Sequence, residues 1–140
     1  MIRLSTSALP VVAYLALTTA TTLHAQERIR AGMWENTVIS STGQTSTRSK
    51  CVKPAEVATT NGSLATTRAE TEKALLKDGC TLKDFKLDGG TITQTMVCGS
   101  TNILSVTTFH DGDSVETKMT YTEGGTTGTT QIKGRRTGAC

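Results

Sequence analysis

Four cysteines, Cys51, Cys80, Cys98 and Cys140, constrain the fold of this 140-residue chain more than any other feature. After residue 25, Leu, Ile, Val and Phe make up only about 17% of the residues, a fraction that predicts disorder when net charge is high. The formal net charge is only +3, so a folded domain remains the expectation, but its core must be small. We therefore expect crosslinks to replace missing apolar contacts. With no C-x-x-C motif and no zinc-like spacing, the cysteines predict structural disulfides.

Four cysteines allow three pairings. We favour Cys51–Cys80 with Cys98–Cys140, which would close loops of about 30 and 43 residues and stabilise the fold by roughly 3.5 to 4 kcal/mol each. The main argument against this pairing is that Cys80 and Cys98 lie close together in the β-hairpin predicted below. The sequence alone does not decide between these arrangements.

The N-terminal segment has the pattern of a secretory signal peptide. Arg3 is the only charged residue before Glu27, and an apolar run of about ten residues, too short to span a bilayer as a helix, lies between them. We predict a signal peptide over residues 1–25, removed after Ala25, and a single disulfide-stabilised β-rich domain over residues 26–140. The expected location is periplasmic or secreted, without a transmembrane segment.

The charged residues exclude some classes of function. Lys and Arg total 15 against 12 for Asp and Glu, a balance too even to indicate nucleic-acid binding. The chain has two histidines, and His24 lies in the segment predicted to be removed. Most histidine-based catalysis and histidine-rich metal sites are therefore not expected, and neither a metal nor a cofactor is predicted.

Period-two patterns predict strands over 33–40, 45–52, 82–87, 91–98, 102–110, 114–121 and 129–136. Pro54 suits the first turn of a helix that Asn61-Gly62 ends, and Thr67 with Glu70 has the capping-box spacing of a second helix of two to three turns. The predicted fold is mainly β (α+β): a curved antiparallel sheet of about seven strands with a short helical insertion, held by disulfides.

The strands before and after Gly89-Gly90 predict a tight hairpin. With the glycines as its two central residues, Leu87 faces Ile92 and Lys83 faces Met96. The core face of this hairpin then consists of Phe85, Leu87, Ile92, Met96 and Cys98.

Several short motifs resemble domain-of-unknown-function family 3617. They are Gly32-Met-Trp-Glu35, Cys51-Val-Lys-Pro-Ala-Glu56, Cys80 before a strand, Met96-Val-Cys98 and the closing Lys133-Gly-Arg-Arg-Thr-Gly-Ala-Cys140. Lys53 departs from the Thr or Ser expected there as a helix cap. The resemblance covers nearly all of residues 26–140 and implies a small exported, cysteine-containing proteobacterial protein of the periplasm. It implies no activity and supplies no catalytic residue.

Trp34, Glu35 and Arg136 are the candidate ligand-binding residues. Trp34 could stack on a ligand, although burial as an apolar anchor is favoured in so small a core. Arg135 and Arg136 point to opposite faces of a regular strand, and either they or Lys133 could recognise phosphate or carboxylate. We favour a structural role, in which the inward-pointing arginine pairs with a carboxylate such as Glu35.

Other polar motifs favour structural interpretations. His110-Asp111-Gly112-Asp113 lacks both a nucleophile partner and the further ligands of a calcium loop, and we interpret it as a hairpin turn. The threonine runs at 91–95 and 126–130 lack the regular repeat of an ice-binding or carbohydrate-binding array and fit the solvent-facing side of strands.

The leading hypothesis is a non-enzymatic envelope binding or accessory module, because no nucleophile–base pair is recognisable. Its curved sheet would pack the helical insertion on the concave face and leave a small apolar pocket for a small envelope ligand or protein partner. The alternative is a small hydrolase whose site combines scattered polar residues, His110 among them. A third possibility is an interaction protein that uses an uncovered sheet edge.

Overall fold

The computed structural model of the chain describes residues 27–140, and the predicted signal peptide at residues 1–25 lies outside this range. The described part contains strands and two helices in the order predicted from the period-two patterns. They are β1 (Gly32–Ile39), β2 (Thr45–Val52), α1 (Pro54–Thr60), α2 (Leu64–Lys77), β3 (Cys80–Asp88), β4 (Thr91–Cys98), β5 (Thr101–His110), β6 (Ser114–Glu123) and β7 (Thr126–Gly138).

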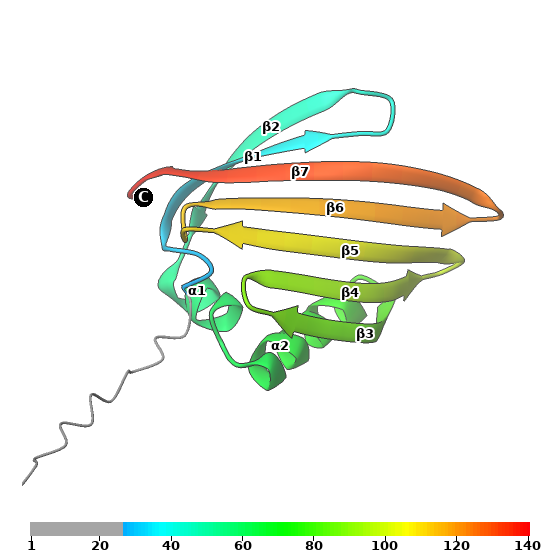
Figure 1. Ribbon diagram of the computed structural model, residues 1–140, viewed down its shortest axis with the longest axis horizontal. Coiled ribbons are helices and arrows are strands. Elements are labelled where there is room, and N and C mark those ends of the chain that lie inside the picture. Colours follow the sequence, from blue (N-terminus) through cyan, green and yellow to red (C-terminus); the bar gives the residue numbers. More distant parts are fainter. Residues whose placement is uncertain (1–26) are drawn as a thin grey trace, which may run out of the picture.

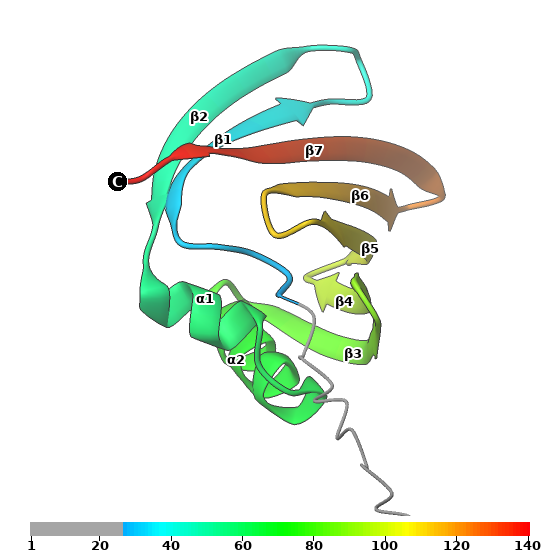
Figure 2. The same cartoon turned by 60° about the vertical axis from the view of Figure 1, so that its left-hand side comes forward.

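All seven strands form one antiparallel sheet in the order β2-β1-β7-β6-β5-β4-β3. The sheet is strongly curved and does not close, so β2 and β3 remain its edges (Figures 1 and 2). The two helices connect these edge strands, and Figure 2 shows them on the side toward which the sheet curves. The predicted curved antiparallel sheet with a helical insertion is confirmed. No helix within residues 27–140 is long and apolar enough to cross a membrane.

The strand register divides the side chains between two faces, because directly paired residues point to the same side of a sheet. We call the side that carries Trp34 the inner face. Its members on β1, β7, β6 and β5 include Asn36, Val38, Ile132, Gly134, Val115, Met119, Tyr121, Ser105 and Phe109. Apart from Ser105 and Gly134, these inner-face residues are only half-buried.

The apolar core is as small as the composition predicts. Within the described residues, the buried apolar side chains are Trp34, Cys80, Leu82, Phe85 and Met96. Four of the five belong to the β3–β4 hairpin, against which α2 packs. The rest of the inner face is therefore available to solvent or to a ligand.

The β3–β4 hairpin contains a bulge that the sequence pattern did not reveal. Leu87 pairs with Ile92 as predicted, but Met96 pairs with Leu82, so the predicted pairing with Lys83 is wrong. One extra residue at Lys83 shifts the strand so that Leu82 joins Phe85 on the core side. The bulge thus lets an irregular sequence bury two large side chains that strict alternation would separate.

The favoured disulfide pairing is also wrong: the bonds are Cys51–Cys140 and Cys80–Cys98. Because of the bulge, Cys80 lies directly opposite Cys98, with a Cα–Cα distance of 4.2 Å. Met33 of β1 is the register partner of both Cys51 on β2 and Gly138 at the end of β7. Cys140 follows Gly138 by two residues and therefore reaches Cys51, with a Cα–Cα distance of 5.6 Å. The Cys51–Cys140 bond thereby joins β2, an edge strand, to the end of the last strand.

The helix boundaries follow the predictions in part. Pro54 begins α1 and Asn61 ends it, as expected. However, α2 begins after Ser63, whose Oγ accepts a hydrogen bond from the Thr66 backbone nitrogen at 3.2 Å, so Thr67 is not the cap. Thr67 is instead buried, and its hydroxyl donates to backbone carbonyls before α2. With 14 residues, α2 has about four turns, compared with the two to three predicted.

Candidate functional site

Residues 27–31, here called the N-terminal strap, cross from α1 to the β5–β6 turn. The side-chain amide of Asn61 fixes the strap: its Oδ1 accepts from the backbone nitrogens of Arg28 (2.8 Å) and Ile29 (3.0 Å), and its Nδ2 donates to the Ile29 carbonyl (2.8 Å). Arg28 is buried, and its guanidinium donates to the carbonyls of Thr60 at 2.6 Å and Gly62 at 2.5 Å. The strap is thus fixed to the end of α1.

Arg30 fixes the other side of the strap. Its backbone nitrogen donates to the Gly112 carbonyl at 3.0 Å, and its guanidinium forms an ion pair with Asp113 at 2.7 Å. The hydrogen bond from Arg30 to Glu27, followed by the charge of Asp113, raises the pKa of Arg30. Burial has the opposite effect on Arg28, whose pKa it lowers. No local sequence pattern marks these residues as structural, because the partners of the Arg28 guanidinium, and Gly112 and Asp113 for Arg30, are distant along the chain.

The strap positions Trp34, whose indole nitrogen donates to the Arg30 carbonyl at 2.9 Å. This bond satisfies the only polar atom of the indole, and Trp34 is just 3% exposed. The prediction that Trp34 is a buried anchor is therefore confirmed. Trp34 is nevertheless one of the residues that line a cavity.

The cavity beside Trp34, here called the Trp34 pocket, has a volume of about 230 Å³. Its lining is mostly apolar and comes from the strap, the sheet and the end of α1. The lining residues are Ile29, Trp34, Asn36, Val52, Thr60, Phe109 and Val115. Gly134 brings two of them together, since a Cβ at this position would lie 2.5 Å from Asn36 Oδ1 and 2.7 Å from Val115 Cγ1.

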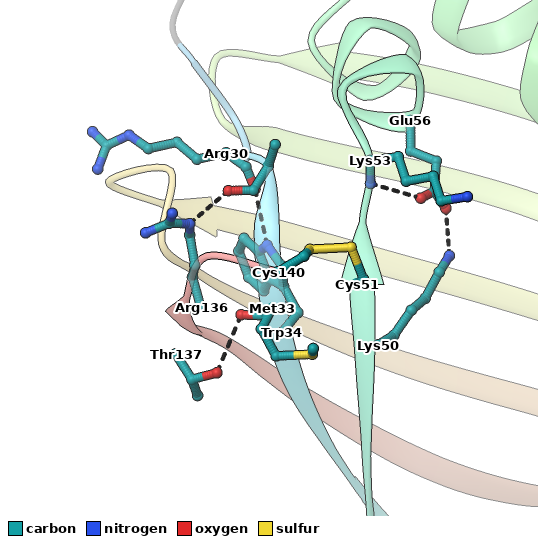
Figure 3. Close-up of a disulfide and its surroundings, with 11 residues drawn as sticks. Arg30, Met33, Trp34, Lys50, Cys51, Lys53, Glu56, Arg136, Thr137 and Cys140 are labelled. Atoms are coloured by element: carbon teal, nitrogen blue, oxygen red, sulfur yellow. Dashed lines mark hydrogen bonds and ion pairs between the residues drawn. A yellow bond between two sulfur atoms is a disulfide. The ribbon is translucent and has the colours of Figure 1, made fainter.

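A second cavity, here called the Arg136 pocket, lies beside the Cys51–Cys140 disulfide and has a volume of about 290 Å³. Figure 3 shows Arg136 and Trp34 near this disulfide, with Lys53 at the start of α1. Arg136 Nε donates to the carbonyl of Ala31 in the strap at 2.7 Å. The strap therefore touches both Trp34 and Arg136.

The three predicted ligand-binding residues do not share one face. Trp34 and Arg136 are register partners on β1 and β7 and belong to the inner face. Glu35 belongs to the outer face, where its carboxylate pairs at 3.3 Å with Arg135, which is 70% exposed. The prediction that the inward-pointing arginine pairs with Glu35 is wrong, because alternation along β7 places Arg136 inward and leaves the outer arginine opposite Glu35.

The remaining polar candidates lie outside both pockets. His110 is exposed at the end of β5 and precedes the turn that Asp111 forms with a positive φ of 52°, in agreement with the predicted hairpin turn. The His110 ring makes no hydrogen bond or ion pair with any residue in the range 27–140. Over the same range, no group of three or more His, Cys, Asp and Glu side chains could hold a metal ion.

Comparison with known proteins places the chain in one family. The family model "Protein of unknown function (DUF3617)" matches residues 29–140, so the chain belongs to this family. Neither the curated proteins nor the solved structures contain a significant match. The family resemblance suggested by the cysteine and glycine motifs is thereby confirmed.

Proposed function

We propose that this member of the family is an exported, non-enzymatic binding module of the bacterial envelope, which holds the apolar part of a small amphiphile in the Trp34 pocket. One observation carries the proposal: a largely apolar cavity, lined in part by Trp34, opens on a sheet face whose apolar side chains remain half-exposed. Ligand sites in proteins are typically concave, mostly apolar and lined by few polar groups.

The size of the cavity selects the kind of ligand. About 230 Å³ corresponds to about eight water molecules, at roughly 30 Å³ each in the liquid. This volume accommodates the end of an alkyl chain, but not a whole lipid. The rest of the chain would lie along the inner face, where Val38, Met119 and Ile132 are half-buried. Burial of apolar ligand surface is worth about 25 cal/mol per Å² and supplies the driving force.

Other features support the location and the lack of catalysis. The two disulfides suit an oxidising compartment such as the periplasm or the cell exterior. His110, the histidine on which a hydrolase would depend, is absent from the lining of the Trp34 pocket. Catalysis by His110 at a ligand held there would require a rearrangement of the β5–β6 turn.

Trp34 is the only tryptophan in the sequence, so its fluorescence reports directly on the pocket. The test uses residues 26–140 in oxidised form and a neutral decyl alcohol brominated at the end of its chain, because bromine quenches an indole that it touches. We expect saturable quenching. Val115→Phe fills the pocket and should weaken binding at least about tenfold, the equivalent of roughly 1.4 kcal/mol. Val106→Phe, on the outer face of β5, is the matched control and should bind normally.

Two results would refute the proposal: quenching that rises linearly with the alcohol and never saturates, or equal affinities of the Val115→Phe and Val106→Phe variants. Near-ultraviolet circular dichroism checks that each variant is folded. If Val115→Phe does not fold, the unmodified chain still tests the proposal, because its quenching by the brominated alcohol must saturate.

A further inference from the structure

We infer that the Arg136 pocket is an anion site, in which Arg136 binds the carboxylate or phosphate headgroup of the amphiphile. The inference deepens the proposed function and depends on it for the position of the alkyl chain. The anion site can nevertheless be tested independently of the Trp34 pocket.

The charged side chains that line this pocket are both positive. Among its lining side chains, the two that carry charge are the cations Arg136 and Lys53, and no Asp or Glu side chain contributes. Lys53 lies beside Glu56, whose carboxylate accepts from Lys50 Nζ and, at 3.0 Å, from the backbone nitrogen of Lys53. Figure 3 shows these residues on the other side of the disulfide from the Arg136 guanidinium, so Arg136 is the cation available to a headgroup. Within residues 27–140, neither Arg136 nor the Lys53 ammonium forms an ion pair. A charged ligand for this cavity is therefore an anion.

The guanidinium of Arg136 is held in an orientation that suits binding of an anion. Its Nε donates to the Ala31 carbonyl at 2.7 Å, and its guanidinium lies against Gly32, where a Cβ would come within 2.6 Å of Nε. The described residues accept no hydrogen bond from the two terminal nitrogens of this guanidinium. A guanidinium with free terminal nitrogens can bind carboxylate or phosphate through two parallel hydrogen bonds. The fixed orientation reduces the entropy that binding would cost.

The two pockets adjoin. Val52 lines both, and Trp34 and Arg136 are register partners, whose Cβ atoms in neighbouring strands lie about 4.5 to 5.5 Å apart. A headgroup at Arg136 and an alkyl chain beside Trp34 can therefore belong to one molecule. This geometry identifies the ligand class as a single-chain amphiphile with an anionic headgroup.

The first test compares ligands that differ only in the headgroup: decanol, decanoate and decyl phosphate, each titrated against Trp34 fluorescence. We expect at least one anion to bind about tenfold more tightly than decanol, as one charge-assisted bidentate contact would provide. The preferred anion identifies the headgroup. Arg136→Gln should abolish this preference, Arg136→Lys should keep part of it, and Arg135→Gln, which removes the neighbouring outward-facing cation, should leave it unchanged.

The second test detects the headgroup alone. Acetate and inorganic phosphate are added while the Nε–H signal of Arg136 is followed by nuclear magnetic resonance. A saturable shift with either ion supports the anion site without using the alkyl chain. It also shows whether a free anion suffices or whether only the tethered headgroup binds measurably.

The outcomes separate the two proposals. Equal binding of decanol and both anions, with no shift of the Arg136 signal, overturns the anion site and leaves the Trp34 pocket intact. Failure of all three decyl compounds to bind overturns the proposed function, while a shift with acetate or phosphate would still uphold the anion site. A headgroup preference that survives Arg136→Gln overturns the assignment to Arg136. Should Arg136→Gln not fold, Arg136→Lys and the ion titration of the unmodified chain decide.

Discussion

The two disulfides differ in the length of chain that they close, and this difference predicts unequal contributions to stability. Cys51–Cys140 joins residues 89 apart in sequence, whereas Cys80–Cys98 joins residues only 18 apart. In the chain-entropy relation, loops of this length give about 4.6 and about 3.2 kcal/mol, respectively. We therefore expect the double variant Cys51→Ala/Cys140→Ala to lose about 1.4 kcal/mol more stability than Cys80→Ala/Cys98→Ala, a tenfold difference in the unfolding equilibrium.

The consequence is large for so small a core. Net stabilities of domains are typically about 5–15 kcal/mol, so a loss of about 4.6 kcal/mol corresponds to between a third and nine-tenths of that total. Urea denaturation of the two double variants and the unmodified chain measures the free energies of unfolding. Because the crosslinks act on the unfolded chain, both variants should also show larger m-values, as their unfolded states expose more surface.

The reverse order of stability would refute this reasoning. Cys80 is buried, whereas Cys140 is exposed, so loss of native packing would affect the Cys80–Cys98 variant more. A larger loss in that variant would show that packing at the sulfur atoms, rather than restriction of the unfolded chain, determines the contribution of each bond.

Peptide mapping tests the pairing itself. Trypsin places the four cysteines on separate peptides, 51–68, 78–83, 87–118 and 137–140, because Pro54 protects the bond after Lys53. Without reduction, 51–68 should be linked to 137–140, and 78–83 to 87–118. A peptide 51–68 linked to 78–83 would contradict the fold as well as the pairing.

Three further predictions concern single residues. The hydrogen bond from Lys50 lowers the pKa of Glu56, so the stabilisation by the ionised carboxylate is present at neutral pH and is lost as the pH falls through the lowered pKa. In urea denaturation at a series of acidic pH values, Glu56→Gln should therefore reduce the pH dependence of the free energy of unfolding by at most about 1 kcal/mol. Gly134→Ala should destabilise by about 1–3 kcal/mol in urea denaturation, because its Cβ has no space. Asn61→Ala should release the strap at a cost of about 1–3 kcal/mol, speed hydrogen exchange in residues 28–30 and shift Trp34 emission to the red.

The sheet was predictable because its determinants are local. Alternating residues mark each strand, and Gly89-Gly90 and the Asp111–Asp113 segment mark two of the turns, so neighbouring strands pair in the order of the sequence. The bulge at Lys83 was not predictable in the same way. The bulge buries Leu82 opposite Met96 in the hairpin against which α2 packs, and a short sequence window contains no information on that packing.

The sequence predicted individual residues of the site, but not how the fold brings them together. The burial of Trp34 and the opposite directions of Arg135 and Arg136 follow from composition and alternation. The disulfide Cys51–Cys140 and the pocket beside it require that β7 pair with β1, about 100 residues away in sequence. The sequence predicts correctly that Asn61 ends a helix. It does not predict that the side-chain amide of Asn61 also fixes the position of the strap. Roles of this kind arise from contacts across the fold and leave no periodic pattern.

A small core and an open binding face have the same physical origin in this protein. The sheet curves without closing, so apolar side chains such as Ile132 and Met119 remain half-exposed where a closed barrel would bury them. A ligand that covers this face would complete the core and stabilise the folded state by RT ln(1 + [L]/Kd), about 2.7 kcal/mol at a hundredfold excess over Kd. The unfolding temperature should therefore rise with the concentration of a bound decyl amphiphile. Tight binding by Trp34 quenching without any rise would place the ligand away from the folded sheet and contradict this link.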